Sequence, residues 1–200
     1  MAKINVVAIE RQYCSGGSEI GKRTAELLGV PCYDHELVTM AAERIGISAE
    51  DVEKYEESVI NPLKASLSLH RNDQLDAFEK VFAAETKIIS ELVRKGPCVI
   101  VGRCAGYILK SVTPTLKVYI CADFESRADR AANEHGIPYK EIPARLKRYD
   151  KKRGDYFNIN TRLEWDDMET YDLCLNSSAL GTEACAKYIA AIVKASGAAE

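Results

Sequence analysis

The sequence predicts an α/β fold in which a parallel sheet of five strands is covered by helices on both faces. Short apolar runs alternate with segments whose apolar residues recur at helical spacing along almost the whole chain. Parallel neighbours in a sheet need crossover connections, which the intervening helices supply. No internal repeat or low-complexity segment interrupts the alternation, and 200 residues suit a single domain with a small insertion.

The strands are expected at the short apolar runs. In chain order, these runs are residues 4–9, 30–33, 98–101, 116–121 and 171–175. Right-handed crossovers place the C-terminal ends of all parallel strands on one rim, where open α/β sheets bind their ligands. We therefore expect residues 16–22, Asp34, Arg103 and the residues after Ile120 to meet on that rim.

The helices are expected between these strands. Gly29 closes the first helix, and Asp34 caps the second, which stops at Gly46. Residues 48–70 are less regular, with two short helical patterns separated by Asn61-Pro62. The longer helices are expected at residues 21–28, 35–45, 73–94, 124–135, 139–152 and 182–195. The irregular stretch 48–95 is the natural insertion to close over a substrate.

Composition and charge argue against several classes of protein. The formal net charge is −3 with acidic and basic residues interleaved, which disfavours a nucleic acid polymer as partner. The chain opens without a signal-peptide pattern and has no apolar stretch near the roughly 20 residues that span a bilayer. We expect a cytoplasmic protein without membrane contact. The seven cysteines form no CxxC pair, which disfavours a disulfide framework or a zinc site.

A glycine-rich segment directly after the first strand is the best functional clue. Gly16 and Gly21 stand at the spacing of a P-loop, whose backbone N–H groups surround a polyphosphate while the next lysine, here Lys22, reaches the outer phosphates. The alternative is a glycine-rich turn with a solvated Lys22. The usual hydroxyl after the lysine is replaced by Arg23 and comes one place later, as Thr24. The expected phosphate-binding residues are Ser15, Gly16, Gly17, Ser18, Glu19, Ile20, Gly21, Lys22, Arg23 and Thr24.

Several motifs together resemble one family. They are Ser15-Gly16-Gly17 with Ile20-Gly21-Lys22, Tyr33-Asp34-His35-Glu36-Leu37, Val99-Ile100-Val101-Gly102-Arg103, and Tyr171-Asp172-Leu173 with Asn176-Ser177. Over nearly its full length the chain is similar to the cytidylate kinase-like P-loop family. The resemblance implies one kinase domain over residues 1–200, with a P-loop NTPase-type three-layer α/β/α core. A helical acceptor-binding insertion at about residues 35–95 and a short mobile lid at about 139–165 would complete it.

The resemblance also implies the reaction and its participants. The family transfers the γ-phosphate of ATP, with Mg²⁺, to a nucleoside monophosphate, with CMP or dCMP favoured. Mg²⁺ takes oxygen ligands, so Thr24 is the expected protein hydroxyl in its shell. The partner is therefore a nucleotide or another small phosphate acceptor.

Phosphoryl transfer depends on positioning and on cations that neutralise the moving charge. We expect Lys22 to bind the β- and γ-phosphates and Arg103 the acceptor phosphate. Arg148 and Arg153 would reach the γ-phosphoryl group when the lid closes, and Asp150 with Arg153 has the spacing of the family's lid. For Arg103, pairing with a carboxylate at a helix start stays open. For residues 147–153, a solvated basic face stays open.

Other charged residues keep alternative roles. Asp34 would bind the metal through water, orient the acceptor or accept its proton, besides capping its helix. Arg127 and Arg130 would touch the adenine or ribose of ATP, or make surface pairs with Glu134. For Arg11, near the end of the first strand, the spacing alone does not decide whether the side chain faces the phosphates.

Two positions depart from the pattern of true cytidylate kinases. Those enzymes carry Asp-Gly-Arg-Asp after the third strand, whereas this chain has Val101-Gly102-Arg103-Cys104. The missing aspartates belong near the metal and on the cytosine edge, so two alternatives stay open. One is a kinase of a non-nucleotide hydroxyl with Asp34 as base, and the other is a nucleotide-binding regulatory module with little turnover. The helix at 73–94 would support a homodimer or lie across the sheet of a monomer.

Overall fold

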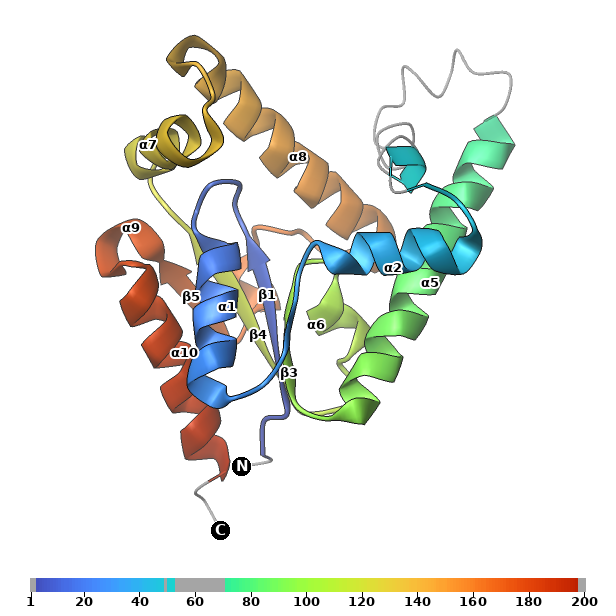
Figure 1. Ribbon diagram of the computed structural model, residues 1–200, viewed down its shortest axis with the longest axis horizontal. Coiled ribbons are helices and arrows are strands. Elements are labelled where there is room, and N and C mark those ends of the chain that lie inside the picture. The colour runs from blue at the N-terminus through green and yellow to red at the C-terminus, as the bar shows by residue number, and fades with distance from the viewer. Residues whose placement is uncertain (1–2, 49, 53–70, 198–200) are drawn as a thin grey trace.

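The computed structural model describes residues 3–48, 50–52 and 71–197, with the side chains of residues 71–77 left out. Figure 1 shows the arrangement of its elements. In chain order they are β1 (Val6–Arg11), α1 (Gly17–Leu28), β2 (Cys32–Tyr33), α2 (Glu36–Ile45), α5 (Arg71–Lys95), β3 (Cys98–Val101), α6 (Ala105–Ile108), β4 (Thr115–Cys121), α7 (Phe124–His135), η1 (Tyr139–Glu141), α8 (Ile142–Thr161), η2 (Met168–Thr170), β5 (Leu173–Asn176), α9 (Ser177–Leu180) and α10 (Thr182–Gly197).

The strands form a five-stranded sheet in the order β2-β3-β1-β4-β5, and every pair of neighbours is parallel. The expected parallel sheet is confirmed. Because all strands run in the same direction, their C-terminal ends lie on one rim. In Figure 1, α7 and α8 lie above that rim.

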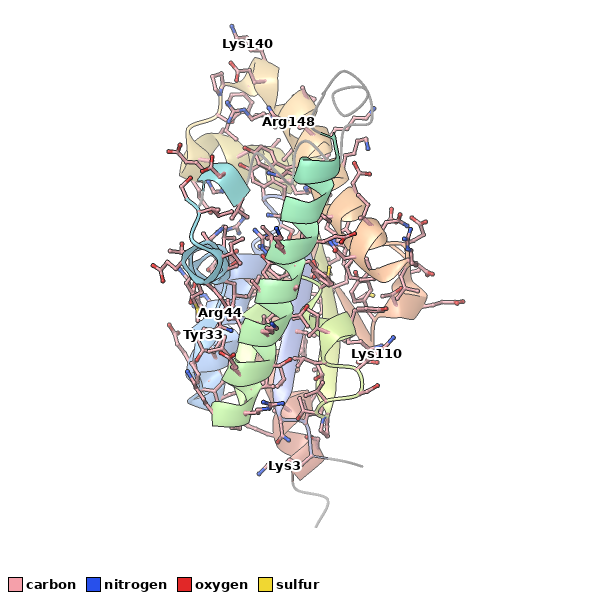
Figure 2. All side chains as sticks on the ribbon, turned by 90° about the vertical axis from the view of Figure 1, so that its right-hand side faces the viewer. Lys3, Tyr33, Arg44, Lys110, Lys140 and Arg148 are labelled. Carbon is pink, nitrogen blue, oxygen red and sulfur yellow. The ribbon has the colours of Figure 1, made fainter. Side chains whose placement is uncertain are left out.

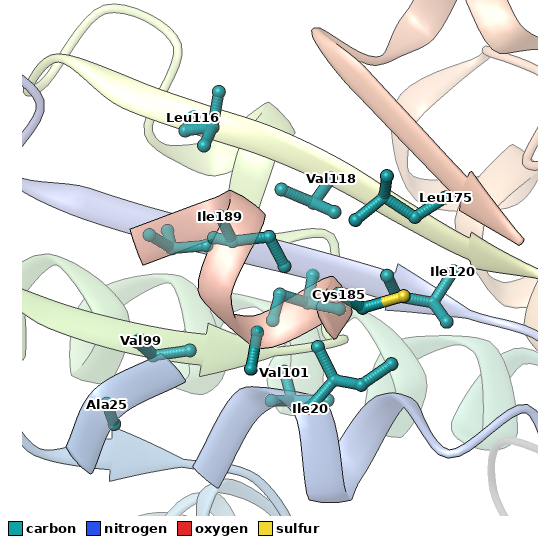
Figure 3. Packing of buried hydrophobic residues seen from close by; sticks show 13 residues of the cluster. Ile20, Ala25, Val99, Val101, Leu116, Val118, Ile120, Leu175, Cys185 and Ile189 are labelled. Carbon is teal, nitrogen blue, oxygen red and sulfur yellow. The ribbon is translucent and has the colours of Figure 1, made fainter. Parts of the chain in front are cut away.

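Alternation along β1 separates two hydrophobic layers, since successive side chains of a strand point to opposite faces. Val7 and Ile9 belong to the layer under α1 and α10, where Ile20 and Ile189 are also buried (Figure 3). Val6 and Ala8 belong to the layer that packs against α2, α5 and α6. Helices therefore cover both faces, which confirms the three-layer α/β/α architecture.

Helix α1 begins earlier than predicted. We expected a loop through Ile20 and a helix from Gly21, but α1 starts at Gly17. Gly16 ends the loop in the left-handed region, at φ 79°, and its carbonyl accepts the N–H of Ile20 at 2.9 Å. Ser18, Glu19 and Ile20 contain no helix breaker, so they continue the helix toward the strand. The loop is residues 12–16 only.

Helix α8 is longer than predicted. We expected its end near residue 152, but it continues to Thr161 and stops at Arg162, which adopts φ 64°. Gly154 lies inside it with Trp165 alongside, and Tyr156 and Phe157 are buried in an aromatic cluster. Tertiary packing therefore keeps this polar segment helical.

Other expectations have mixed outcomes. The last strand starts at Leu173 instead of residue 171, while Gly29 and Gly46 end α1 and α2 as expected. The short helical patterns within residues 53–70 lie outside the described residues. Among the helices that are described, none combines the length and the apolar character of a membrane span.

Candidate active site

The loop of residues 12–16 is tied to the sheet on both sides. The N–H of Gln12 donates to the carbonyl of Ile120 at 3.0 Å, and the Ser15 hydroxyl donates back to the carbonyl of Gln12 at 2.9 Å. The Ser177 hydroxyl, from the end of β5, donates to the Ser15 carbonyl at 2.6 Å. Links to β4 and α9 thus hold the loop before any ligand arrives.

The N-terminus of α1 opens directly onto this loop. The first N–H groups of an α-helix have no partner inside the helix, and Gly16 provides no side-chain cap. The N–H groups of Gly17, Ser18 and Glu19 are therefore the natural donors for an anion, with the positive end of the helix dipole behind them.

Arg11 runs from the end of β1 along this helix start. A Cβ atom on Gly17 would lie 2.5 Å from the Arg11 Cβ, and a Cβ on Gly102 would collide with the guanidinium. The guanidinium donates to Asp34 Oδ1 at 3.2 Å, and only 12% of the side chain is exposed. Arg11 therefore fills the space between two glycines, with its charge next to a carboxylate.

A cavity of about 180 Å³, which we call the rim pocket, lies next to Arg11. Residues from β1, the ends of β2 and β3, and α8 line it, including Arg11, Asp34, Arg103, Lys152, Arg153 and Tyr156. The structure thus brings together Asp34, Arg103 and Arg153, as the sequence predicts. Such a concentration of cations around a cavity favours an anionic ligand.

Asp34 is 6% exposed, and one of its oxygens is unused. Oδ1 accepts from Arg11, while the buried Oδ2 has no hydrogen-bond partner among the described residues. His35 Nε2 lies 3.9 Å from Oδ2. The predicted capping role is wrong, because the carboxylate turns to Arg11 and α2 has no side-chain cap. Asp34 instead presents a buried acceptor to the rim pocket.

Arg103 is held by a buried acid. Its Nη1 lies 3.1 Å from Oε1 of Glu85, a residue of α5 that is fully buried, and its guanidinium stands 5.4 Å from the centre of the Tyr156 ring. The Tyr156 hydroxyl donates to the same Glu85 carboxylate. Arg103 and Cys104 both adopt left-handed φ angles, 58° and 54°. Arg103 therefore has a carboxylate partner, the alternative that the sequence leaves open, and it also lines the rim pocket.

Two residues of α8 tie this helix to the loop. Arg153 donates to the carbonyl of Arg11 at 2.8 Å, and burial, with the nearby Arg11 charge, lowers the pKa of Arg153 to about 9. Asp150 accepts the N–H of Tyr13 at 2.7 Å and pairs with Arg127. Both Asp150 oxygens are therefore engaged with protein groups.

The remaining predicted arginines are dispersed. Arg148 stands 5.9 Å from the Tyr149 ring and is not among the residues that line the rim pocket. In Figure 2 it lies toward the end of the molecule that Lys140 marks. Arg127 is buried and donates to the Tyr13 carbonyl at 2.8 Å, so the expected surface pair of Arg127 with Glu134 is wrong. Such a pair exists for Arg130, at 2.8 Å.

A second hollow, which we call the outer pocket, lies on the other side of the loop. Its volume is about 320 Å³, and its lining includes Cys14, Ser15, Ser126, Arg130, Ser177 and Thr182. Gly16 packs closely against two residues that line this pocket, because a Cβ there would lie 2.8 Å from Thr182 Cγ2 and 3.3 Å from Arg130 Cζ. The rim pocket is thus lined from the β2 and β3 side of β1, and the outer pocket from the β4 and β5 side.

Lys22 and Thr24 lie apart from both pockets. Lys22 is exposed and lines a separate hollow with Glu26, Gly29 and Cys32. It stands about 7.5 Å along the helix axis from Gly17, at 1.5 Å per residue. Thr24 is fully buried two turns into α1. The expected phosphate segment is therefore only partly at the loop, because its second half is helix.

The residues at the loop offer different oxygens for Mg²⁺. Thr24 does not fit, because its side chain is fully buried two turns into α1, away from the loop. Ser18 is half-buried in the first turn of α1, and Asp34 has its unpartnered buried Oδ2. A hydroxyl and a carboxylate suit Mg²⁺, which keeps several waters and takes its other ligands from phosphates. The oxygens present fit the ion at the loop.

Sequence reasoning missed two contributors to this site. The spacing around Arg11 does not decide its role, although a cation at the end of a strand before a glycine-rich turn is a signal for the phosphate side. Glu85 lies within a long helix, and only tertiary packing brings it under Arg103. The sequence contains no local signal for that contact.

Comparisons with known proteins identify relatives of this chain. A model of the cytidylate kinase-like family matches residues 6–179. The cytidylate kinase of Pyrococcus horikoshii is 27% identical over 192 residues, which cover 95% of this chain and 86% of the relative. The cytidylate kinase of Ignicoccus hospitalis is 25% identical over 187 residues, which cover 93% and 97%.

Solved structures share the fold. A protein from Eubacterium ventriosum superposes with a TM-score of 0.70 at 22% identity, covering 94% of this chain and 98% of its own. A shikimate kinase from Acinetobacter baumannii, in complex with shikimate, gives 0.54 at 14% identity, with 96% and 94% covered. At these identities the likeness shows a common fold and nothing finer.

Proposed function

The chain belongs to the cytidylate kinase-like family, and on that premise we propose that it transfers the γ-phosphate of Mg-ATP to a nucleoside monophosphate. The observation that carries the proposal is the pair of pockets on opposite sides of the end of β1, the strand that leads into the loop and α1. A donor on one side and an acceptor on the other would meet at the helix N-terminus, where phosphate is stabilised.

The outer pocket suits the nucleoside part of ATP. Arg130 and Thr182 line it, and Ser126 and Ser177 offer hydroxyls to a sugar or base. The triphosphate would then run along residues 12–16 to the N–H groups of α1. Ser18 would hold Mg²⁺, which when bound would neutralise charge on the phosphate oxygens.

The rim pocket suits the acceptor. Arg103 and Arg153 would bind the monophosphate, while Tyr156 and Phe157 line the pocket beside them. An acceptor phosphate oxygen attacks the γ-phosphorus, and the bond to the β–γ bridging oxygen breaks with its electron pair leaving on ADP. A dianionic acceptor needs no proton removed, so the residues act by position and charge.

The geometry favours CMP or dCMP through Asp34. Its buried Oδ2 is an acceptor without a partner among the described residues, and the exocyclic amine of cytosine is a donor. Pairing the two would supply the recognition of cytosine that Cys104, which stands in place of the family's aspartate, does not provide. A site with such an acceptor discriminates against a base without the amine.

The same oxygen also favours the second candidate, a kinase of a non-nucleotide hydroxyl. A hydroxyl nucleophile loses its proton as it attacks, and the unpartnered Asp34 Oδ2 at the pocket is the group to accept it. In this case Arg103 matters less, because the acceptor carries no phosphate.

The test is ADP release from Mg-ATP with CMP, dCMP, UMP, AMP or GMP, and with Arg103→Met as the matched variant. Strong stimulation by one monophosphate, lost in Arg103→Met, supports the nucleotide kinase. Stimulation by hydroxyl compounds alone, lost in Asp34→Asn, favours the second candidate. ATP binding without any acceptor-dependent ADP overturns both and leaves a nucleotide-binding regulatory module.

A further inference from the structure

We propose that Arg11, and not Lys22, is the cation that contacts the transferred phosphoryl group. This inference rests on the proposed function, and it assigns a catalytic residue that the glycine-lysine pattern of the sequence does not indicate. Three features carry it: the register of the loop, the path of the Arg11 side chain, and its unused hydrogen-bonding capacity.

The point at which the loop passes into the helix differs between the structure and the glycine-lysine pattern of the sequence. In a P-loop, the lysine stands where the loop passes into the helix, with a hydroxyl residue after it. Here the loop ends at Gly16, the helix begins at Gly17, and Ser18 follows. The structural place of the lysine is therefore taken by a glycine, and Lys22 stands more than a turn further along the helix.

Arg11 occupies the space that this glycine leaves. Its Cβ and Cγ lie where a Gly17 side chain would stand, at 2.5 and 2.7 Å from the position of that Cβ. Its guanidinium continues over Gly102 to the rim pocket. Gly17 carries no charge, and the guanidinium of Arg11, from β1, thus provides one between the helix N-terminus and the acceptor site.

The guanidinium of Arg11 retains capacity for a ligand. It donates to Asp34 Oδ1 at 3.2 Å, while its buried Nε has no hydrogen-bond partner among the described residues. A buried N–H without a partner is unfavourable, and a phosphate oxygen would satisfy it. Arg153, which donates to the Arg11 carbonyl, fixes the strand end and adds a second positive charge.

The experiment compares single glutamine variants in the acceptor-dependent ADP assay. Arg11→Gln keeps the carbons that lie on Gly17, and kcat should fall about 10²–10³-fold, as when one preorganised donor is removed from a transition state. Arg11→Lys should recover part of that loss. Lys22→Gln should keep the wild-type kcat, as should Arg44→Gln, a matched arginine on the exposed side of α2. A kcat loss of this size in Lys22→Gln, or none in Arg11→Gln, overturns the inference.

Two further measurements separate other causes. Arg11→Gln leaves Asp34 buried without its partner, so the double variant Arg11→Gln/Asp34→Asn, checked by thermal unfolding, controls for a folding defect. If that folded double variant turns over as fast as Asp34→Asn alone, the inference fails. If the wild type itself shows no acceptor-dependent turnover, the proposed function fails instead. Calorimetric titration with ATP then decides, because weaker binding by Arg11→Gln supports the phosphate contact and equal binding overturns it.

Discussion

At the scale of single residues, the buried acid under Arg103 is the most consequential contact of the site. Glu85 is fully buried, and it pairs with Arg103 at 3.1 Å while accepting from Tyr156. Removing one partner of a buried pair leaves the other charge uncompensated. Glu85→Gln should lower the free energy of unfolding by about 3 kcal/mol and raise the acceptor KM.

The same helix supplies the control for that prediction. Glu91 pairs with Arg44 at 2.7 Å, but both side chains are exposed. Such surface pairs contribute about 0–1 kcal/mol, so Glu91→Gln should change urea-induced unfolding little and the acceptor KM not at all. Equal destabilisation by the two variants would contradict a special role for Glu85.

Glu19 should make the stability of the protein depend on pH. Burial raises its pKa, but hydrogen bonds from Arg23, Thr182 and Arg130 outweigh that effect and lower the pKa below 4.5. The ionised carboxylate therefore stabilises the fold above pH 4.5, and this stabilisation is lost as pH falls through the lower folded-state pKa. Glu19→Gln should cost about 0.5–1 kcal/mol at pH 7, the range of a solvent-screened pair.

Chemical denaturation at a series of pH values checks the Glu19 prediction. The wild type and Glu19→Gln should converge in stability at the acidic end, where the wild-type carboxyl is protonated. Because the partners are partly exposed, added salt should also reduce the difference at pH 7. A difference that persists unchanged into acid would show that packing, and not charge, is responsible.

At the scale of elements, α1 shows why the phosphate-binding segment predicted from the sequence lies only partly at the loop. Gly16 and Gly21 have the right separation for a phosphate loop, but separation alone does not indicate where the helix begins. Gly21 has another reason to be glycine, since a Cβ there would lie 2.7 Å from Val101 Cγ2. It allows α1 to approach the sheet closely.

This close approach predicts an unusual substitution effect. Alanine in place of an interior helical glycine normally stabilises a helix by about 1 kcal/mol. Gly21→Ala should instead destabilise the protein by about 1–3 kcal/mol through overpacking against β3. Thermal unfolding should show that Gly21→Ala destabilises the protein less in a Val101→Ala background, by comparison of the double variant with Val101→Ala alone. A stabilised Gly21→Ala would mean that α1 does not press on the sheet.

At the scale of the whole molecule, the sequence predicts the parallel sheet and its rim because periodicity and topology are local or general rules. The strand at residues 98–101 and the glycine ends of α1 and α2 follow from such rules. The convergence of side chains does not. Glu85 reaches Arg103 through the packing of α5, and Asp34 turns to Arg11 instead of capping α2. These choices are made by tertiary contacts.

The link between α8 and the loop also concerns the whole molecule, because the proposed lid at residues 139–165 depends on it. Asp150 accepts from the Tyr13 N–H and pairs with Arg127 of α7. Asp150→Asn should weaken both contacts and raise amide hydrogen exchange in α8 relative to α5. The reason is that local opening costs less when few contacts hold an element.

A matched variant on the same helix makes this test selective. Asp155 pairs with Lys151 within α8, so Asp155→Asn perturbs the helix without touching the loop. Hydrogen–deuterium exchange measured by mass spectrometry should rise across α8 and at residues 12–16 in Asp150→Asn alone. ATP should suppress that rise, because phosphates bound at the loop restore the surface on which α8 rests. Equal exchange in the two variants would mean that α8 stays closed independently of the loop, and the lid would then have to open by another hinge.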